Sequence, residues 1–131
     1  MIVADTHIII WNALKAEMLS RKAEKAISAA NNSDGIIFCE ISLWEIAMLM
    51  HKGRLSIDIQ YTEFIQLIIQ STQYVFRGIT PEIAWLSAHL FSEDTKDPAD
   101  RIIAATSIVE NANLVTADKD LRQSKKVATI W

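Results

Sequence analysis

Short apolar runs alternate along the chain with longer segments in which apolar residues recur at helical spacing. The runs predicted to be strands are residues 2–4, 35–39, 73–79, 113–117 and 127–131. A helix is expected directly after the first strand, through "HIIIWNAL". Strands that alternate with helices favour parallel pairing, because each connecting helix returns the chain to the same edge of the sheet. The pattern therefore predicts an α/β domain with a mostly parallel sheet of about five strands flanked by helices.

Five residues at the starts of helical segments are typical helix N-caps. They are Ser20, Ser42, Thr62, Thr80 and Asp97, and a proline directly follows each of the last two. A short polar side chain at this position accepts a hydrogen bond from a backbone N–H that has no partner within the helix. Proline suits the first helical position because it has no N–H and its φ is already helical. We therefore expect a helix to begin after each of these residues.

The composition favours one globular domain over residues 1–131. The chain is 50% hydrophobic, and no shift in composition marks a linker. The single Cys39 excludes a disulfide within the chain, and its apolar neighbours predict a small buried side chain. The first residues lack the pattern of a signal peptide, and no apolar run approaches the ~18 residues of a membrane span. We therefore expect a soluble cytoplasmic protein without membrane contact.

The balance of charges does not mark the chain as a nucleic-acid-binding protein. It carries 13 basic and 16 acidic residues, a net charge of −3, whereas such proteins commonly have a basic excess. The three glycines form neither of the glycine-rich loops that hold nucleotide phosphates, so a nucleotide cofactor is disfavoured. Any binding of phosphate must therefore come from a local basic patch or from a metal ion.

Four acidic residues are expected at one edge of the predicted sheet. In parallel sheets, ligands bind outside the carboxyl ends of the strands, where loops enter the helices. Asp5 follows the first strand, Asp118 follows the fourth, and Glu45 lies in the first turn of the helix after the second. Asp100 opens a long helix, but a helix over about residues 81–91 separates it from the third strand, so its placement is the least direct.

Each acid also has a structural interpretation. In "SLWE", Ser42 and Glu45 can form a capping box, in which each side chain accepts a hydrogen bond from the other residue's backbone N–H. Asp97 can cap the next helix in the same way, and Asp5 and Asp118 can form turns at strand ends. Taken singly, capping is the favoured role for Glu45 and Asp97, and both interpretations stay open for the other two.

Taken together, the four acids favour a metal site over the structural interpretation. Carboxylates a few ångströms apart repel one another, so four of them at one edge would destabilise the fold unless a cation offset their charge. Hard oxygen ligands without a histidine or cysteine cluster favour Mg²⁺, for which Mn²⁺ can substitute. A magnesium phosphotransfer domain is disfavoured, because "DTH" stands in place of the DxD motif of phosphoaspartate hydrolases.

Four segments, in this order, resemble the PIN domain, and closely the VapC-type toxins of bacterial and archaeal toxin–antitoxin systems. They are "VADTHIIIW" at the start, "EISLWEIAMLMHKGRL" at 40–55, "DPADRIIAATSIVENANLVTAD" at 97–118 and the closing "VATIW". None is specific alone, but the ordered set covers nearly the whole chain. The resemblance implies a three-layer PIN-like fold in one domain. It also implies a metal-dependent endoribonuclease that cleaves RNA as a toxin and has an antitoxin protein as its partner.

The same resemblance implies roles for individual residues. The catalytic acids are Asp5, Glu45, Asp100 and Asp118. All but Glu45 are expected to bind Mg²⁺ directly, and Glu45 is a further ligand or orients the attacking water. Thr6 and Thr116 are expected to support these acids with their hydroxyl groups. His7 stands where many PIN domains have a small polar residue; "DTH" is typical of the toxin branch, and its structural interpretation is a helix-start residue that does not touch the metal.

Four basic residues are candidates for contacts with RNA phosphates, or for an ordinary charged surface. They are Lys52, Arg54, Lys119 and Arg122. Such contacts give affinity without sequence specificity. Asp120 is expected to be a solvated charge, and His51 and His89, which have no acids at metal-ligand spacing, are expected to be structural.

The large apolar side chains predict both a core and an interface. Most of the four tryptophans are expected in the core. The helix from Leu43 to Met50 is apolar nearly all round and must be covered on more than one side, either in a homodimer or by an antitoxin helix. The alternative to a ribonuclease is a catalytically inactive PIN-like module that acts by protein contact. That alternative predicts no metal-dependent cleavage of RNA.

Overall fold

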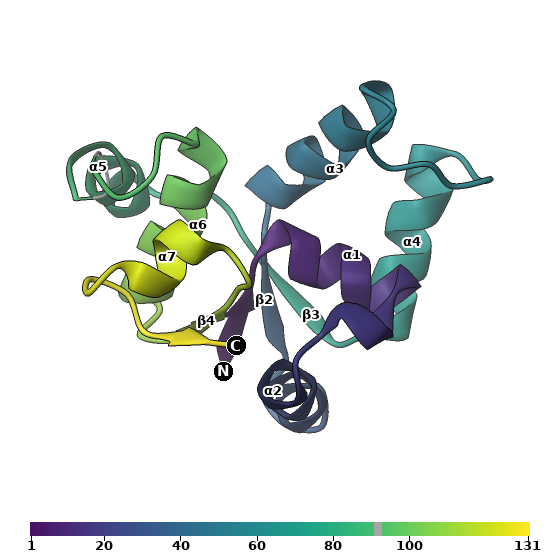
Figure 1. Ribbon diagram of the computed structural model, residues 1–131, viewed down its shortest axis with the longest axis horizontal. Helices are drawn as coiled ribbons and strands as arrows, with labels where there is room; N and C mark the ends of the chain where they lie inside the picture. Colours follow the sequence, from purple (N-terminus) through teal and green to yellow (C-terminus); the bar gives the residue numbers. More distant parts are fainter. Residues whose placement is uncertain (91–92) are drawn as a thin grey trace.

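A single five-stranded sheet crosses the computed structural model, which describes residues 1–90 and 93–131 (Figure 1). Its strands are β1 (Ile2–Ala4), β2 (Ile36–Cys39), β3 (Tyr74–Arg77), β4 (Asn113–Val115) and β5 (Thr129–Ile130). Their order is β3-β2-β1-β4-β5, and every pairing among them is parallel. The predicted parallel sheet is therefore confirmed, with β1 at its centre and with strands that are mostly shorter than the apolar runs.

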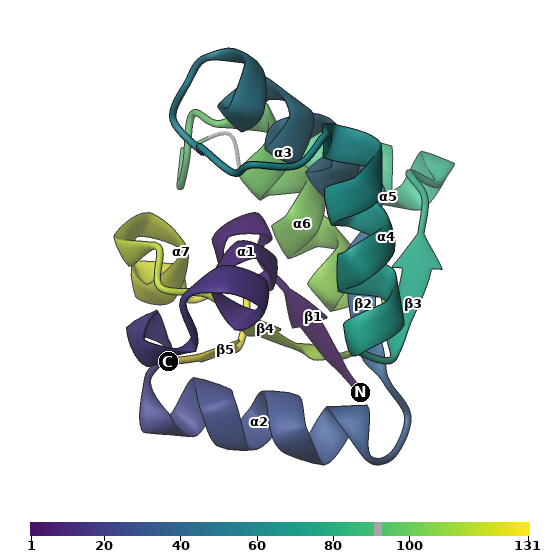
Figure 2. The ribbon, with the colours of Figure 1, turned by 90° about the vertical axis from the view of Figure 1, so that its right-hand side faces the viewer.

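Helices cover both faces of the sheet (Figures 1 and 2). They are α1 (Thr6–Leu14), α2 (Arg21–Asn31), α3 (Ile41–His51), α4 (Tyr61–Ser71), α5 (Pro81–His89), α6 (Pro98–Val109) and α7 (Lys119–Gln123), with a short 3-10 helix η1 (Ala16–Met18). One face carries α1, α2 and α4, and the other carries α5, α6 and α7. The three predicted layers are therefore confirmed. None of the described helices combines the length and the apolar character that a membrane crossing needs.

Two hydrophobic cores arise from the alternation of side chains along the strands. On β1, Ile2 and Ala4 pack into one core and Val3 packs into the other, because successive side chains of a strand point to opposite faces. The first core includes Ile8 of α1, and the second includes Ile103 of α6. A strand buried on both faces has no polar alternation, which explains the apolar run at the start of the chain.

Three of the five predicted helix starts are confirmed. They are those at Ser20, Thr80 and Asp97, each of which accepts a backbone N–H of the following turn. The start at Thr62 is wrong by two residues, because α4 begins at Tyr61 after Gln60. The Tyr61 hydroxyl donates to the carbonyl of Leu43 (2.7 Å), so a contact with α3 holds the first residue of α4.

The predicted start at Ser42 is also wrong. α3 begins at Ile41, and its N-cap is Glu40, whose own backbone is already helical (φ −58, ψ −28). The Glu40 N–H donates to the carbonyl of Arg77 on β3 (2.9 Å). Because this bond holds the chain at the end of the sheet, β2 passes into α3 without the extended residue that a side-chain cap needs.

The expectation that most tryptophans lie in the core is wrong. Trp44 and Trp85 are 58% and 64% exposed. Trp11 and Trp131 are half-buried at the margin of the core that α1 covers. The chain therefore presents large aromatic surfaces to solvent.

The position of α3 explains the exposure of its apolar side chains. This helix projects from the carboxyl edge of the sheet and lies flat on neither face (Figure 1). Within it, the buried residues are Ser42 and Ile46. Cys39, at the end of β2, is buried as predicted.

Candidate active site

The four predicted acids line one cavity of about 350 Å³ at the carboxyl ends of β1 and β4. They are Asp5 after β1, Glu45 on α3, Asp100 in the first turn of α6 and Asp118 at the start of α7. The remaining lining residues are His7, Trp11, Asp97 and Ala117. β1 leads to α1 on one face of the sheet and β4 leads to α7 on the other (Figure 1). Such divergence of neighbouring connections opens a crevice at the strand ends.

Asp5 is held firmly at the end of β1. Its side chain is 5% exposed; Oδ1 accepts the N–H of Thr6 (2.8 Å), and Oδ2 accepts the hydroxyl proton of Thr116 (2.6 Å). Burial raises the pKa of the Asp5 carboxyl, and these two hydrogen bonds act in the opposite direction. Both oxygens therefore have fixed directions before a ligand binds, which is the preorganisation that a functional site requires.

Thr116 joins Asp5 to Asp118. This fully buried residue follows β4, donates its hydroxyl proton to Asp5, and accepts the N–H of Asp118 (3.0 Å). Asp118 Oδ2 in turn accepts the N–H of Leu121 (2.9 Å) and so caps α7. Asp5 and Asp118 therefore occupy structural positions at strand ends and also line the cavity. Their interpretation as structural residues is thus compatible with their interpretation as site residues.

Glu45 is connected to α1 by a chain of hydroxyl groups. The Thr6 hydroxyl donates to Glu45 Oε1, and Ser42 Oγ lies 2.7 Å from Thr6 Oγ1. Because Thr6 has one hydroxyl proton and gives it to Glu45, Ser42 is the donor to Thr6. The capping interpretation of Glu45 is therefore wrong: α3 begins at Ile41, so Ser42 is a helical residue and Glu45 lies beyond the first turn.

Glu45 and Asp100 hold a proton more tightly than acids in water do. The pKa of Glu45 is raised to about 7, first by burial and then by the charges of Asp5 and Asp97. The pKa of Asp100 is raised to about 8, again first by burial and then by the other acids of the cavity. The cavity therefore concentrates negative charge that the chain's own residues do not fully offset.

Asp97 is the N-cap of α6, as predicted, and belongs to the acidic cluster too. Its Oδ1 accepts the N–H groups of Ala99 (2.9 Å) and Asp100 (3.4 Å). Carboxylate oxygens of Glu45, Asp97 and Asp100 lie within 4.8 Å of one another. Hard oxygen donors at this spacing fit a divalent cation such as Mg²⁺.

The ligand set expected from the sequence did not include Asp97. One signal was available: an acid three residues before another on a helix lies near the same face, so an acid at the cap of α6 reaches the space that Asp100 reaches. Capping was the favoured role for Asp97 from the sequence, and whether this residue also assists the site stayed open.

One family model covers nearly the whole chain. The model described as "PIN domain" matches residues 2–127. The chain belongs to the PIN domain family. Across 132 aligned residues, 99% of this chain and 98% of the relative, it is 33% identical to "Ribonuclease VapC22" of Mycobacterium tuberculosis. The predicted resemblance to PIN domains is therefore confirmed.

Solved structures share the fold of this PIN domain. A "Toxin-antitoxin complex from Klebsiella pneumoniae" contains a chain that is 23% identical with a TM-score of 0.65, covering 98% of this chain and 97% of that chain. VapBC2 from Rickettsia felis, bound to a DNA fragment from its promoter, contains a chain that is 17% identical with a TM-score of 0.71, also covering 98% and 97%. At these identities the likeness concerns the fold.

The predicted basic residues of the PIN domain separate into two pairs. The pairs are Lys119 with Arg122, and Lys52 with Arg54. The first pair lies on α7, after Asp118, and lines a second hollow together with Trp131. The second pair is exposed beyond the last residue of α3 and, within the described part of the chain, lines neither hollow. The first pair is therefore the one next to the acids.

The remaining candidates lie at the margin of the acidic cavity or outside it. His7 lines the cavity from the first turn of α1 but does not belong to the group of carboxylates within 4.8 Å of one another. Asp120 is exposed, as expected, and His51 and His89 are exposed and line neither hollow in the described residues.

Proposed function

We propose that this PIN domain is an endoribonuclease that uses Mg²⁺, with Mn²⁺ able to substitute, and acts as the toxin of a toxin–antitoxin pair. The observation that carries the proposal is the acidic cavity, in which carboxylates from separate segments meet, and in which burial and then the neighbouring charges raise the pKa of Asp100. The relative named Ribonuclease VapC22, 33% identical over the whole chain, supports the same activity.

The carboxylates would hold the cation and move the protons. When bound, the ion supplies a Lewis acid for the scissile phosphate and a water of lowered pKa. Asp97 and Asp100 are the ligands with the closest spacing to Glu45. Glu45 Oε1 accepts the Thr6 proton, which leaves Oε2 to receive the proton of the attacking water. A pKa of about 7 suits that transfer at neutral pH. The water oxygen forms a bond to phosphorus as the P–O3′ bond breaks, and the leaving O3′ takes a proton from solvent, which gives a 5′-phosphate and a 3′-hydroxyl.

The test is cleavage of single-stranded RNA by the purified chain, freed of any antitoxin. We expect cleavage in Mg²⁺ or Mn²⁺ and none in excess chelator. Asp100→Asn, purified in parallel, should lose the activity, which separates it from a contaminating ribonuclease. If the folded protein cleaves nothing in a broad panel of RNAs with Mn²⁺, the catalytically inactive interaction module becomes the better account.

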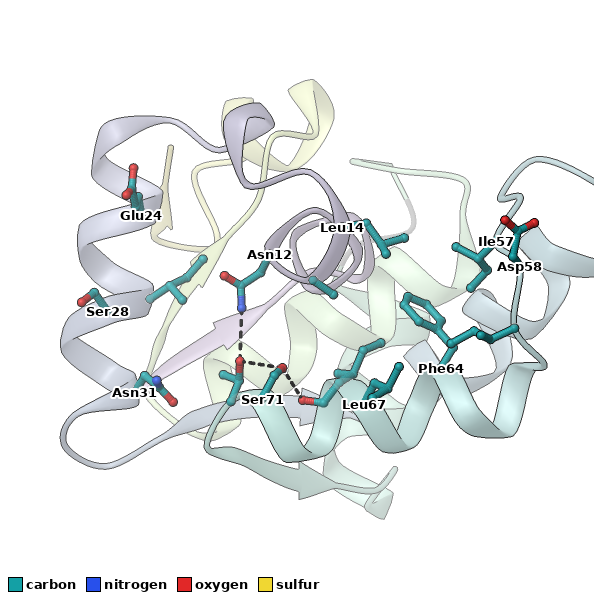
Figure 3. A pocket seen from close by; sticks show the side chains of 15 residues that line it. Asn12, Leu14, Glu24, Ser28, Asn31, Ile57, Asp58, Phe64, Leu67 and Ser71 are labelled. Atoms are coloured by element: carbon teal, nitrogen blue, oxygen red, sulfur yellow. Dashed lines mark hydrogen bonds between the residues drawn. The ribbon is translucent and has the colours of Figure 1, made fainter.

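An apolar groove of about 700 Å³ supports an antitoxin as partner. It lies between α1, α2 and α4, and Leu14, Phe64 and Leu67 point into it (Figure 3). Leu14 and Leu67 are 42% and 55% exposed, and a contiguous apolar surface of this kind is typical of an interaction site. The apolar face of an amphipathic helix fits such a groove. The structural neighbour from Klebsiella pneumoniae is itself a toxin–antitoxin complex.

The exposed face of α3 supports a homodimer. Trp44 is 58% exposed, and Leu43 and Met48 beside it are half-buried. Light scattering at micromolar concentration should report about twice the 14.8 kDa mass of one chain. Trp44→Glu should shift the protein towards the monomer, because it places a charge on the apolar face. A wild-type protein that stays monomeric would refute the homodimer.

A further inference from the structure

A row of three aromatic rings leads out of the acidic cavity. His7 and Trp11 line the cavity, with ring centroids 5.9 Å apart and planes tilted by 57°. Trp131 follows at 6.0 Å from Trp11, tilted by 47°, and lines the second hollow, of about 540 Å³. Of the two neighbouring tryptophans, Trp11 therefore lines the acidic cavity and Trp131 lines the second hollow.

The sheet fixes the end of this row relative to the acids. Ile130, directly before Trp131, pairs with Val115 in the parallel register of β4 and β5. Its carbonyl accepts the N–H of Thr116 (3.2 Å), the residue whose hydroxyl donates to Asp5. Thr116 therefore positions both an acid of the cavity and the last ring of the row.

The rings of the row are tilted and do not stack on one another. A second aromatic pair of the chain shows the contrast: Trp85 and His89 on α5 are stacked, with centroids 3.6 Å apart and planes within 23°. In the row, neither neighbouring pair is stacked. His7 is exposed, and Trp11 is half-buried. Aromatic faces that remain accessible are the surfaces on which unpaired nucleobases stack.

Two cationic side chains lie beside the far end of the row. Lys119 and Arg122 line the second hollow with Trp131. Neither forms an ion pair with a carboxylate among the residues that the structure describes. Exposed cations without partners bind RNA phosphates, because they release the counterions that surround the nucleic acid. The second hollow therefore brings the last ring of the row together with two cations.

We propose that the row formed by His7, Trp11 and Trp131 binds unstacked nucleobases of single-stranded RNA next to the cleaved phosphodiester. This inference rests on the proposed ribonuclease function and names the residues that hold the bases of its substrate. The rings contact base faces, while Lys119 and Arg122 contact the neighbouring phosphates. Bases within a duplex cover one another's faces and cannot stack on protein rings. The chain therefore selects single-stranded loops and ends over duplex RNA.

The test is binding of a short labelled RNA strand, measured by fluorescence anisotropy in chelator with Asp100→Asn as the non-cleaving parent. Two substitutions at one position isolate the ring. Trp131→Leu keeps an apolar side chain without a ring, and we expect it to raise Kd by about 10-fold. Trp131→Phe keeps a ring and should stay within about 3-fold of the parent. Trp85→Leu, the matched control on α5, should leave Kd unchanged.

Thermal melting of every variant checks that it folds. His7→Leu, at the exposed end of the row, tests the same stacking where little packing is lost, and should weaken binding as well. If Trp131→Leu and His7→Leu both bind like the parent, or if a duplex of the same sequence binds as tightly as the single strand, the inference is overturned.

The inference and the ribonuclease proposal fail in different ways. A wild-type protein that cleaves no RNA but binds single strands through Trp131 keeps the inference and contradicts the ribonuclease. If the protein cleaves RNA but substitution of Trp131 leaves binding unchanged, the ribonuclease proposal stands and the inference is contradicted.

Discussion

The two sides of the acidic cavity are built differently. The strand side consists of Asp5 and Asp118, at the ends of β1 and β4, which the buried Thr116 joins by hydrogen bonds. The helix side consists of Glu45, Asp97 and Asp100, on α3 and at the start of α6. On the strand side, hydroxyl and backbone donors satisfy the carboxylates. On the helix side, Glu45 and Asp97 also accept hydrogen bonds, but carboxylates of the three acids lie within 4.8 Å of one another as well.

This difference suggests different roles for the two sides: one holds its acids in place, and the other attracts a cation. The strand side already has the hydrogen bonds that hold its acids in place, so a cation is not needed to order it. On the helix side, burial and then neighbouring charges raise the pKa values of Glu45 and Asp100 to about 7 and about 8. Burial also raises the pKa of Asp5 on the strand side, but there two hydrogen bonds act in the opposite direction. We therefore expect the helix side to contribute most to cation affinity and the strand side to orient what binds.

The largest effect is expected on the helix side. Asp100→Asn keeps the shape of the side chain but removes a hard ligand, so the cleavage rate should fall by at least ~100-fold. Without metal the variant should be as stable as the wild type or more so, because one repelling charge is gone. Asp97→Asn preserves the cap of α6, since asparagine caps as well as aspartate. It should weaken Mn²⁺ binding with a smaller loss of rate.

Initial rates and Mn²⁺ titrations of both variants measure this difference. If Asp97→Asn abolishes cleavage and Asp100→Asn is tolerated, the ranking of the two ligands is reversed.

A smaller loss of cleavage rate is expected when a hydrogen bond that holds the strand-side acids is removed. Thr116→Val removes the hydroxyl that donates to Asp5 and accepts from Asp118. Loss of such a supporting hydrogen bond should lower the rate by roughly 10- to 100-fold, and Thr116→Ser should restore most of it. Thr106→Val is the matched control, because this buried threonine donates to the carbonyl of Ile102 within α6 and not to an acid of the cavity. Equal rates for both valine variants would show that the strand side does not orient the acids.

The charge on the helix side should make the stability of the metal-free protein depend on pH. Folded Glu45 and Asp100 titrate at about 7 and about 8, above their ordinary values of 4.5 and 3.8. Protonation therefore stabilises the fold fully below about pH 4, and this stabilisation is lost as the pH rises through about 8. In chelator, the melting temperature should fall by several degrees across this window, relative to Asp100→Asn.

Mn²⁺ should raise the melting temperature most at high pH, because ionised carboxylates bind the cation. Melting curves with and without Mn²⁺ at each pH provide the measurement. If the melting temperatures of the wild type and of Asp100→Asn change in parallel with pH, Asp100 is excluded as the source of the pH dependence.

The smallest effect is expected for the basic residues outside the acidic cavity, in the salt dependence of RNA binding. Lys119 on α7 continues the strand side, whereas Lys52 lies beyond the far end of α3. Lys119→Ala should reduce the slope of log affinity against log salt by about 0.7, the value for one phosphate contact on a single strand. Lys52→Ala should change it less. RNA binding of the non-cleaving protein at several salt concentrations tests this, and equal slopes would remove the distinction between the pairs.

Interactions between near neighbours in the chain were predictable from the sequence. The caps at Ser20, Thr80 and Asp97 were correct because a side-chain oxygen and the N–H groups that it accepts lie within three residues of each other. The order of strands and helices was predictable for a similar reason, since the spacing of apolar residues reflects which faces of a segment are buried. The positions of Asp5 and Asp118 after strands then followed from the rule for parallel sheets.

Interactions between distant segments were decided by the tertiary structure. The sequence favoured a capping box between Ser42 and Glu45, but the Glu40 N–H pairs with β3 and starts α3 earlier, which turns both side chains towards Thr6. Asp97 likewise joins the acidic cluster because α3 brings Glu45 beside the start of α6. Such contacts join residues far apart in the chain: Thr6 and Glu45 are 39 positions apart. Local propensity carries no information about them, since the packing of whole helices on the sheet determines which side chains meet.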